Sequence, residues 1–205
     1  MRKLIVDFDG TIVDCSQRDY ALYADIMRDL HESKLSFNEY WPKRRQPMNI
    51  RELIRETAQK PESIDQFLKM RLERCELPEY SRFDKPLPGA YFALWMMAKL
   101  FDVYVVSARF NIDNMKNEIN QLRLYGHLKD VIAAKTQNKV EAFKSLLPDV
   151  VAVIGDTEHD ILAAKELGIP AIAVTTGIRS REYLESLEPV AVVDTLVDAL
   201  GIIQQ

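Results

Sequence analysis

The chain has 205 residues, enough for one sizeable domain or for a core domain with a smaller insertion. Apolar residues make up 47% of it and charged residues 28%, so a core can be buried without disulfides or structural metals. The net charge of −4 argues against a broad electrostatic attraction for nucleic acid. Cys15 and Cys75 form no CxxC pattern, and we expect both to be reduced thiols.

The apolar runs are short. The first, residues 4–6, ends in the carboxylate of Asp7 and is far shorter than the core of a signal peptide. Later runs are interrupted well before the length that spans a bilayer. We therefore expect a cytoplasmic protein that has no membrane partner.

Short apolar runs alternate with longer amphipathic stretches, which is typical of an α/β fold. The runs are rich in Val, Ile and Ala and lack in/out alternation, as in a parallel sheet covered by helices on both faces. The predicted strands are 4–8, 103–107, 131–133, 151–154 and 171–174. The predicted helices between them are 90–100, 111–124, 139–146 and 160–167, the last ending at Gly168 and Pro170.

The stretch between the first two strands contains no convincing strand and is predicted to be helical, over 17–31, 37–40 leading into 50–59, and 61–75. Pro61 suits the first turn of a helix. Ile64, Phe67 and Leu68 then recur at helical spacing. We predict a small helical cap domain over 16–85, inserted after the first strand of an α/β core formed by 1–15 and 86–205. Such an insertion lies over the carboxyl ends of the strands, where open α/β sheets bind ligands.

Two acids close the first strand. In extended backbone Asp7 and Asp9 project to the same side, and Gly10 then lets the chain turn. Carboxylates this close repel one another and do not both stay ionised without a cation. On its own, the pair is also compatible with solvated acids at a strand end or with a helix cap.

A second acidic pair follows the strand predicted at 151–154. Asp156 and Asp160 are four residues apart, so both can reach one spot at the start of the next helix. Helix capping would also explain them. Adjacent parallel strands would place Asp7, Asp9, Asp156 and Asp160 along one crevice, and hard oxygen ligands without a His or Cys cluster suit magnesium.

Two further groups fit the same crevice. Ser107 closes the strand between the others and offers a hydroxyl and free backbone amides at a helix entry, a place that binds phosphate oxygens. Lys139 begins a predicted helix and can offset the excess negative charge; Lys135 is the alternative. Gly10, Thr11, Ala108 and Arg109 flank these motifs and are predicted to contact the substrate.

The motifs Asp7-Phe8-Asp9-Gly10-Thr11-Ile12-Val13-Asp14, Ser107, Lys139 and Gly155-Asp156-Thr157-Glu158-His159-Asp160 resemble those of the haloacid dehalogenase (HAD) superfamily. Within it, the chain is similar to capped phosphatases of the phosphoglycolate phosphatase group. The order and spacing agree over the full chain. The lysine departs from the pattern, because the family often has Lys-Pro and this chain has no Pro there.

The resemblance implies a magnesium-dependent phosphatase that acts on a small phosphorylated metabolite. Asp7 would attack phosphorus to form an aspartyl-phosphate. Asp9 would protonate the leaving oxygen and then activate water. Mg²⁺ would be held by Asp7, the Asp9 main-chain carbonyl and Asp156, while Asp160 would orient a magnesium water or Lys139. An acid at the position of Asp9 favours a phosphatase or a phosphomutase over a dehalogenase or a transport ATPase.

Several alternatives stay open at this stage. Lys43 and Arg44, in a loop expected between cap helices, are predicted to contact a second anionic group of the substrate; a solvated charge run is the alternative. A phosphomutase, or an inactive module that binds a phosphorylated ligand, is compatible with the same motifs. We expect no nucleic-acid partner, and either a monomer or a homodimer.

Overall fold

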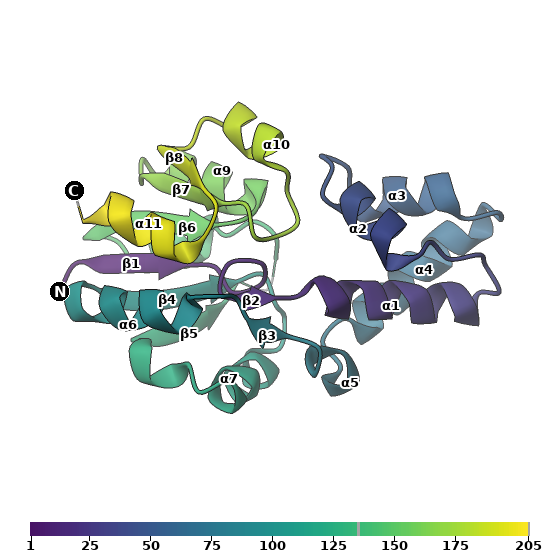
Figure 1. The fold of residues 1–205 in the computed structure, drawn as a ribbon, viewed down its shortest axis with the longest axis horizontal. Helices are drawn as coiled ribbons and strands as arrows, with labels where there is room; N and C mark the ends of the chain where they lie inside the picture. Colours follow the sequence, from purple (N-terminus) through teal and green to yellow (C-terminus); the bar gives the residue numbers. More distant parts are fainter. Residues whose placement is uncertain (135, 205) are drawn as a thin grey trace.

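The core of the fold is a parallel sheet (Figure 1). The computed structural model describes residues 1–134 and 136–204, which form a six-stranded sheet in the order β5-β4-β1-β6-β7-β8, with all neighbours parallel. The strands are β1 (Lys3–Val6), β4 (Asp102–Ser107), β5 (Asp130–Ala133), β6 (Val150–Gly155), β7 (Ala171–Val174) and β8 (Ala191–Val193). This confirms the predicted α/β, Rossmann-like class. The central strand at the site is β1, and not β4 as its place in the chain had indicated.

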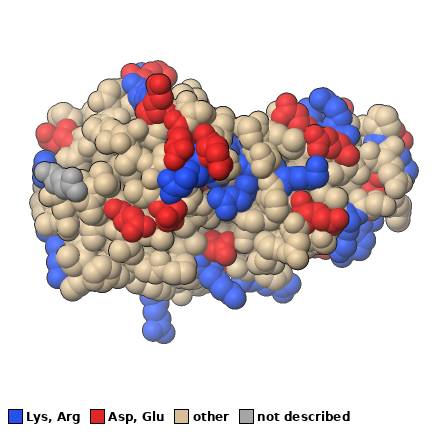
Figure 2. Space-filling model, turned by 45° about the horizontal axis from the view of Figure 1, so that its top comes forward, with Lys and Arg blue, Asp and Glu red and all other residues tan. Residues whose placement is uncertain are grey.

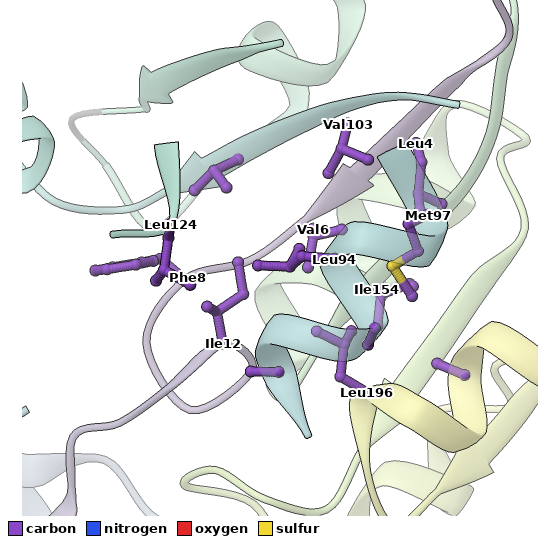
Figure 3. Packing of buried hydrophobic residues seen from close by; sticks show 14 of the residues in the cluster. Leu4, Val6, Phe8, Ile12, Leu94, Met97, Val103, Leu124, Ile154 and Leu196 are labelled. Atoms are coloured by element: carbon purple, nitrogen blue, oxygen red, sulfur yellow. The ribbon is translucent and has the colours of Figure 1, made fainter. Parts of the chain in front are cut away.

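Helices cover both faces of the sheet because successive strand residues point to opposite sides. In β1, Leu4 and Val6 join one buried cluster, to which α6 (Ala90–Leu100), α7 (Ile112–Gln121) and α11 (Leu196–Ile203) contribute (Figure 3). Ile5 joins the other, with α8 (Val140–Lys144), α9 (Glu158–Glu166) and α10 (Arg181–Ser186). A strand buried on both sides explains the uninterrupted apolar pattern of the sequence.

A group of helices follows β1 in the chain and stands apart from the sheet (Figure 1). It comprises α1 (Ser16–Asp29), α2 (Phe37–Arg44), α3 (Ile50–Thr57), α4 (Glu62–Arg74) and α5 (Pro78–Ser81). These helices bury a separate cluster, in which the rings of Tyr23 and Tyr40 stack 4.3 Å apart beside Phe67. The helical cap predicted after the first strand is confirmed.

The chain enters and leaves this cap through a short ribbon. β2 (Val13–Asp14) pairs with β3 (Lys85–Pro86) in antiparallel fashion, so that the two crossings lie side by side. The ribbon coincides with the boundaries expected at 15/16 and 85/86; the division into two domains at these positions stays a prediction.

The structure differs from the sequence-based elements at several points. Helix α2 runs on through Pro42 to Arg44, whereas the pattern had indicated an end at residue 40. β8, α10 and α11 form a final part of the core that the pattern had left without elements. β8 has only three residues, all half-buried, so the apolar run that marks it in the sequence is short. In α11 the signal at the N-terminus is clear, because Thr195 and Asp198 form a capping box.

The surface carries both signs of charge. On the face shown in Figure 2, basic side chains lie beside acidic ones across the core and the cap. No helix in the described part of the chain is long and apolar enough to cross a membrane.

Candidate active site

The predicted site residues meet at one edge of the sheet. Asp7 follows β1, Ser107 ends β4, and Asp156 follows β6. These three strands are neighbours and run parallel, so their carboxyl ends lie together. Asp7, Ser107 and Asp156 also line one cavity of about 260 Å³ between this edge and the cap.

Lys139 connects the two acidic motifs. From the position before α8 its Nζ donates to Oδ1 of Asp7 at 2.5 Å, to Oδ1 of Asp160 at 2.7 Å and to the carbonyl of Val106 at 3.2 Å. The side chain is buried. Burial disfavours the ammonium form, but the carboxylates of Asp160 and Asp7 outweigh that effect and raise the pKa of Lys139. Lys135, the alternative lysine, lies outside the described residues.

The carboxylates around this lysine carry more negative charge than it neutralises. Burial, only partly offset by Lys139, raises the pKa of Asp7 well above its ordinary value. Burial and the neighbouring Asp160 raise the pKa of Asp156 to about 7. Both shifts have one cause, which is the cost of holding several carboxylates together away from water.

This arrangement fits a hard divalent cation. Asp7, Asp156 and Asp160 each offer an oxygen, and these oxygens lie within 4.8 Å of one another. Oδ1 of Asp156 is buried and accepts no hydrogen bond from the described residues, whereas its Oδ2 accepts from the backbone N–H of Ile178 at 2.8 Å. A buried, unpaired carboxylate oxygen among hard oxygen donors suits Mg²⁺. The carboxylate of Asp9 pairs with Arg18 and Arg109, and the predicted contact of Asp9 with the metal is through its main-chain carbonyl.

Glycines allow the loops to close around Asp156. Gly10 has φ +79°, and a Cβ there would lie 2.5 Å from Oδ2 of Asp156. A Cβ on Gly177 would lie 1.7 Å from the same oxygen. Glycine is therefore needed at position 10 for two reasons: the backbone has a positive φ, and a side chain would collide with Asp156.

The groups predicted to hold phosphate are close by. Ser107 is buried and lines the cavity together with Ala108. Thr11 is fully buried, and its Oγ1 has no hydrogen-bond partner among the described residues. Among the described residues, Thr11 is not one of those that line the cavity, so the predicted contact of its side chain with the substrate stays a prediction.

Asp9 is held by two arginines. Arg109 donates from Nε to Oδ2 at 2.9 Å and from Nη2 to Oδ1 at 2.6 Å, and Arg18 of α1 also pairs with Oδ1. Burial favours the neutral acid, but Arg109 and Arg18 outweigh it and hold the pKa of Asp9 well below its ordinary value. Arg109 also pairs with Glu118 at 2.6 Å and with Asp84 at 3.1 Å.

The sequence had indicated Arg109 only as a substrate contact. It lines the cavity, yet most of its hydrogen bonds go to carboxylates of the chain itself. Arg18, Asp84 and Glu118 were not predicted. Glu118 carried a signal, because it lies three residues after the buried Met115 on the apolar face of α7.

The two cap cations predicted to contact the substrate, Lys43 and Arg44, lie in different environments. Lys43 and Arg44 belong to the last turn of α2, so the expectation of a loop was wrong. Lys43 pairs with Glu56 on the surface at 3.1 Å. Arg44 faces the cavity and pairs with Asp19 of α1, as does Arg71 of α4, which sequence reasoning missed.

Comparisons with known proteins agree with this fold. Residues 127–199 match the family model described as HAD-hydrolase-like. The solved structure of a haloacid dehalogenase-like hydrolase from Streptococcus pneumoniae superimposes with a TM-score of 0.81 at 15% identity, covering 100% of this chain and 99% of that one. A predicted phosphoglycolate phosphatase from Haemophilus somnus superimposes with a TM-score of 0.74 at 16% identity, covering 100% and 98%.

Curated relatives match over shorter segments. The Dickeya dadantii protein described as "Probable phosphatase IndB" is 46% identical over 50 residues, 24% of this chain and 22% of that protein. Pyrophosphatase PpaX of Bacillus mycoides is 33% identical over 58 residues, 28% of this chain and 27% of that protein. The matches thus span about a quarter of the relatives' length. Together with the match over residues 127–199, they show that segments of this chain are similar to haloacid dehalogenase-like hydrolases and phosphatases, and the superimposed structures show that the fold is shared.

Proposed function

We propose that the chain is a phosphatase that hydrolyses a small phosphate monoester through an aspartyl-phosphate on Asp7. The observation that carries the proposal is the position of Asp7. Its carboxylate lies at the end of a buried strand, paired with Lys139, in a cavity that also contains Ser107 and Asp156. A nucleophile, a fixed cation and phosphate-binding groups therefore share one small space.

In the first half of the reaction, an oxygen of Asp7 forms a bond to phosphorus while the bond from phosphorus to the ester oxygen breaks. Ser107 and the backbone amides after it hold the phosphoryl oxygens, as expected for groups at a helix entry. Lys139 keeps the Asp7 carboxylate oriented through its hydrogen bond to Oδ1. In the second half, water attacks phosphorus, inorganic phosphate leaves, and Asp7 returns to the carboxylate.

Asp9 is the candidate for proton transfer in both halves. Its carboxylate lines the cavity two residues from the nucleophile. While Arg18 and Arg109 hold it, it is ionised but a weak base, so to accept a proton from water it must lose part of this pairing. To donate a proton it must first lose part of this pairing. An entering phosphoryl group competes for the same two guanidiniums and offers a physical means of weakening it.

Asp7 and Asp156, with Asp160 beside them, would hold Mg²⁺, which when bound offsets negative charge between the nucleophile and the phosphoryl oxygens. The free Oδ1 of Asp156 supports this assignment.

Phosphate release from a panel of small phosphate monoesters, with and without Mg²⁺, tests the function. Asp7→Asn is expected to abolish release. Asp102→Asn is the matched control, because Asp102 begins β4 at the opposite edge of the sheet and is expected to leave activity unchanged. Isomerised substrate without free phosphate would instead identify a phosphomutase. Full activity in Asp7→Asn would refute the nucleophile.

A further inference from the structure

The cap presents a second group of cations to the cavity. Arg44 ends α2 and Arg71 lies in the last turn of α4, and both line the same cavity as Asp7 and Ser107. Their side chains are only 11% and 19% exposed. Two arginines this well covered are unusual unless an acceptor is provided for them.

The chain provides one acceptor for both. Arg44 Nε pairs with Oδ2 of Asp19 at 3.2 Å, and Arg71 pairs with Oδ1 of the same carboxylate. The hydroxyl of Tyr40 also donates to Oδ2, at 2.6 Å. Burial favours the neutral acid, but Arg71 and Arg44 outweigh it and hold the pKa of Asp19 well below its ordinary value. Asp19 is therefore ionised, and its single negative charge compensates only one of the two positive charges of Arg44 and Arg71.

One donor in this group is unsatisfied. Nη1 of Arg71 is buried and donates to no acceptor among the described residues. A buried N–H of a charged group without a partner costs free energy, and an anion placed in the cavity would remove that cost. Arg71 and Arg44 line the cavity from cap helices, whereas Asp7 and Asp156 line it from the edge of the sheet.

The cations that flank Arg44 in the sequence do not present a free charge to the cavity. Lys43 pairs with Glu56 on the surface. Arg45 donates to the carbonyl of Thr175 at 2.7 Å and thereby joins the cap to the core. The cations at the sheet edge are also engaged, because Arg109 pairs with Asp9 and Lys139 pairs with Asp7. Arg71 therefore differs from the other cations named here in that it lines the cavity and keeps a buried donor without an acceptor among the described residues.

We propose that Arg71 and Arg44 bind a second anionic group of the substrate, a carboxylate or a second phosphoryl group. The inference rests on the proposed function and narrows its substrate class to small phosphate compounds with two anionic ends. A cavity of about 260 Å³ lies below the range that is usual for drug-sized ligands, which agrees with a small substrate.

A matched set of substrates tests this. 2-Phosphoglycolate carries a carboxylate where ethyl phosphate carries a methyl group, and pyrophosphate supplies a second phosphoryl group. We expect the wild type to have a kcat/KM at least about 10-fold higher for 2-phosphoglycolate or pyrophosphate than for ethyl phosphate, since a charge-assisted hydrogen bond is involved. Whichever of the two is favoured identifies the second anion.

Arg71→Gln is expected to lower kcat/KM for the favoured substrate by roughly 10- to 100-fold and to change that for ethyl phosphate less than about 3-fold. Arg74→Gln is the control, because Arg74 lies on the same helix and pairs with Asp29 outside the cavity at 2.7 Å. Arg71→Lys keeps the charge and the pairing with Asp19 but loses the second N–H, so it is expected to fold and to show an intermediate loss. An equal loss for both substrates in Arg71→Lys would overturn the inference.

Binding to Asp7→Asn protein separates this inference from the proposed function. If no ester is hydrolysed but calorimetry shows that 2-phosphoglycolate or pyrophosphate binds, and Arg71→Lys weakens that binding roughly 10-fold or more, the phosphatase assignment fails and the anion site stands. If esters are hydrolysed, and neither 2-phosphoglycolate nor pyrophosphate binds more tightly than ethyl phosphate, the phosphatase assignment stands and the anion site fails.

Discussion

Arg109 holds Asp9 through two hydrogen bonds, from Nε to Oδ2 at 2.9 Å and from Nη2 to Oδ1 at 2.6 Å. The same guanidinium pairs with Glu118 inside the core, so it connects the proposed proton-transfer residue to α7. Arg18 adds a connection from the same carboxylate to the first helix of the cap. The ionisation of Asp9 is therefore coupled to the position of the cap.

Replacing Arg18 with Gln is expected to shift the pH dependence of catalysis. Arg18 is one of the two cations that hold the pKa of Asp9 low, so its removal raises that pKa. In the first half of the reaction Asp9 must carry the proton that it gives to the leaving oxygen, so the raised pKa is expected to move the basic limb of kcat/KM against pH to higher pH. Arg28→Gln, on the exposed side of α1, is the control. An unchanged basic limb in Arg18→Gln would contradict the role of Asp9.

Mg²⁺ is expected to stabilise the fold more at pH 8 than at pH 5. The pKa of Asp156 is raised to about 7 in the folded chain, above its unfolded value. Between these values the folded state binds more protons than the unfolded state, so without metal the free energy of unfolding falls as pH rises towards 7. A bound cation removes this penalty at pH 8, where the carboxylate is ionised.

Thermal unfolding at the two pH values, with and without Mg²⁺, measures this difference. Asp156→Asn is expected to abolish the Mg²⁺-dependent rise in Tm. Asp113→Asn, on the exposed first turn of α7, should keep it. A rise of equal size at pH 5 and pH 8 would mean that the cation binds elsewhere.

Lys139→Gln is expected to reduce kcat strongly, by about 10²-fold or more, and to destabilise the metal-free protein by about 3–5 kcal/mol, because it leaves the carboxylates of Asp7 and Asp160 unpaired. Part of the stability should return when Mg²⁺ is added. Lys144→Gln, one turn further along α8 and exposed, should change neither quantity. Urea titrations and steady-state kinetics provide the two measurements; equal behaviour of both variants would refute the role of Lys139.

The strand ends could be predicted because their signal is local. Asp7, Ser107 and Asp156 each end a short apolar run, and parallel strands bring such ends together. Lys139 needed the resemblance, since a lysine at the start of a helix is usually solvated. The structure shows it buried between Asp7 and Asp160.

The arginine clusters could not be predicted because their partners are distant in the chain. Arg109 meets Asp9 and Asp84, and Arg71 meets Asp19 across two cap helices. Each contact forms only when elements that are distant in the sequence pack together, and the contact of Arg71 with Asp19 lies within the cap itself. The sequence did contain one hint for Arg71, which lies four residues after the buried Phe67 and so on the apolar face of α4.

The most direct test of the account is to locate the phosphoryl group during turnover. The wild-type protein is mixed with a substrate that it hydrolyses, and the reaction is quenched in acid during turnover. The protein is then digested, and its peptides are mapped by mass spectrometry. We expect one phosphoryl group on Asp7 of the wild type and none on the Asp7→Asn protein. A phosphoryl group on another residue, or turnover by Asp7→Asn at the wild-type rate, would contradict it.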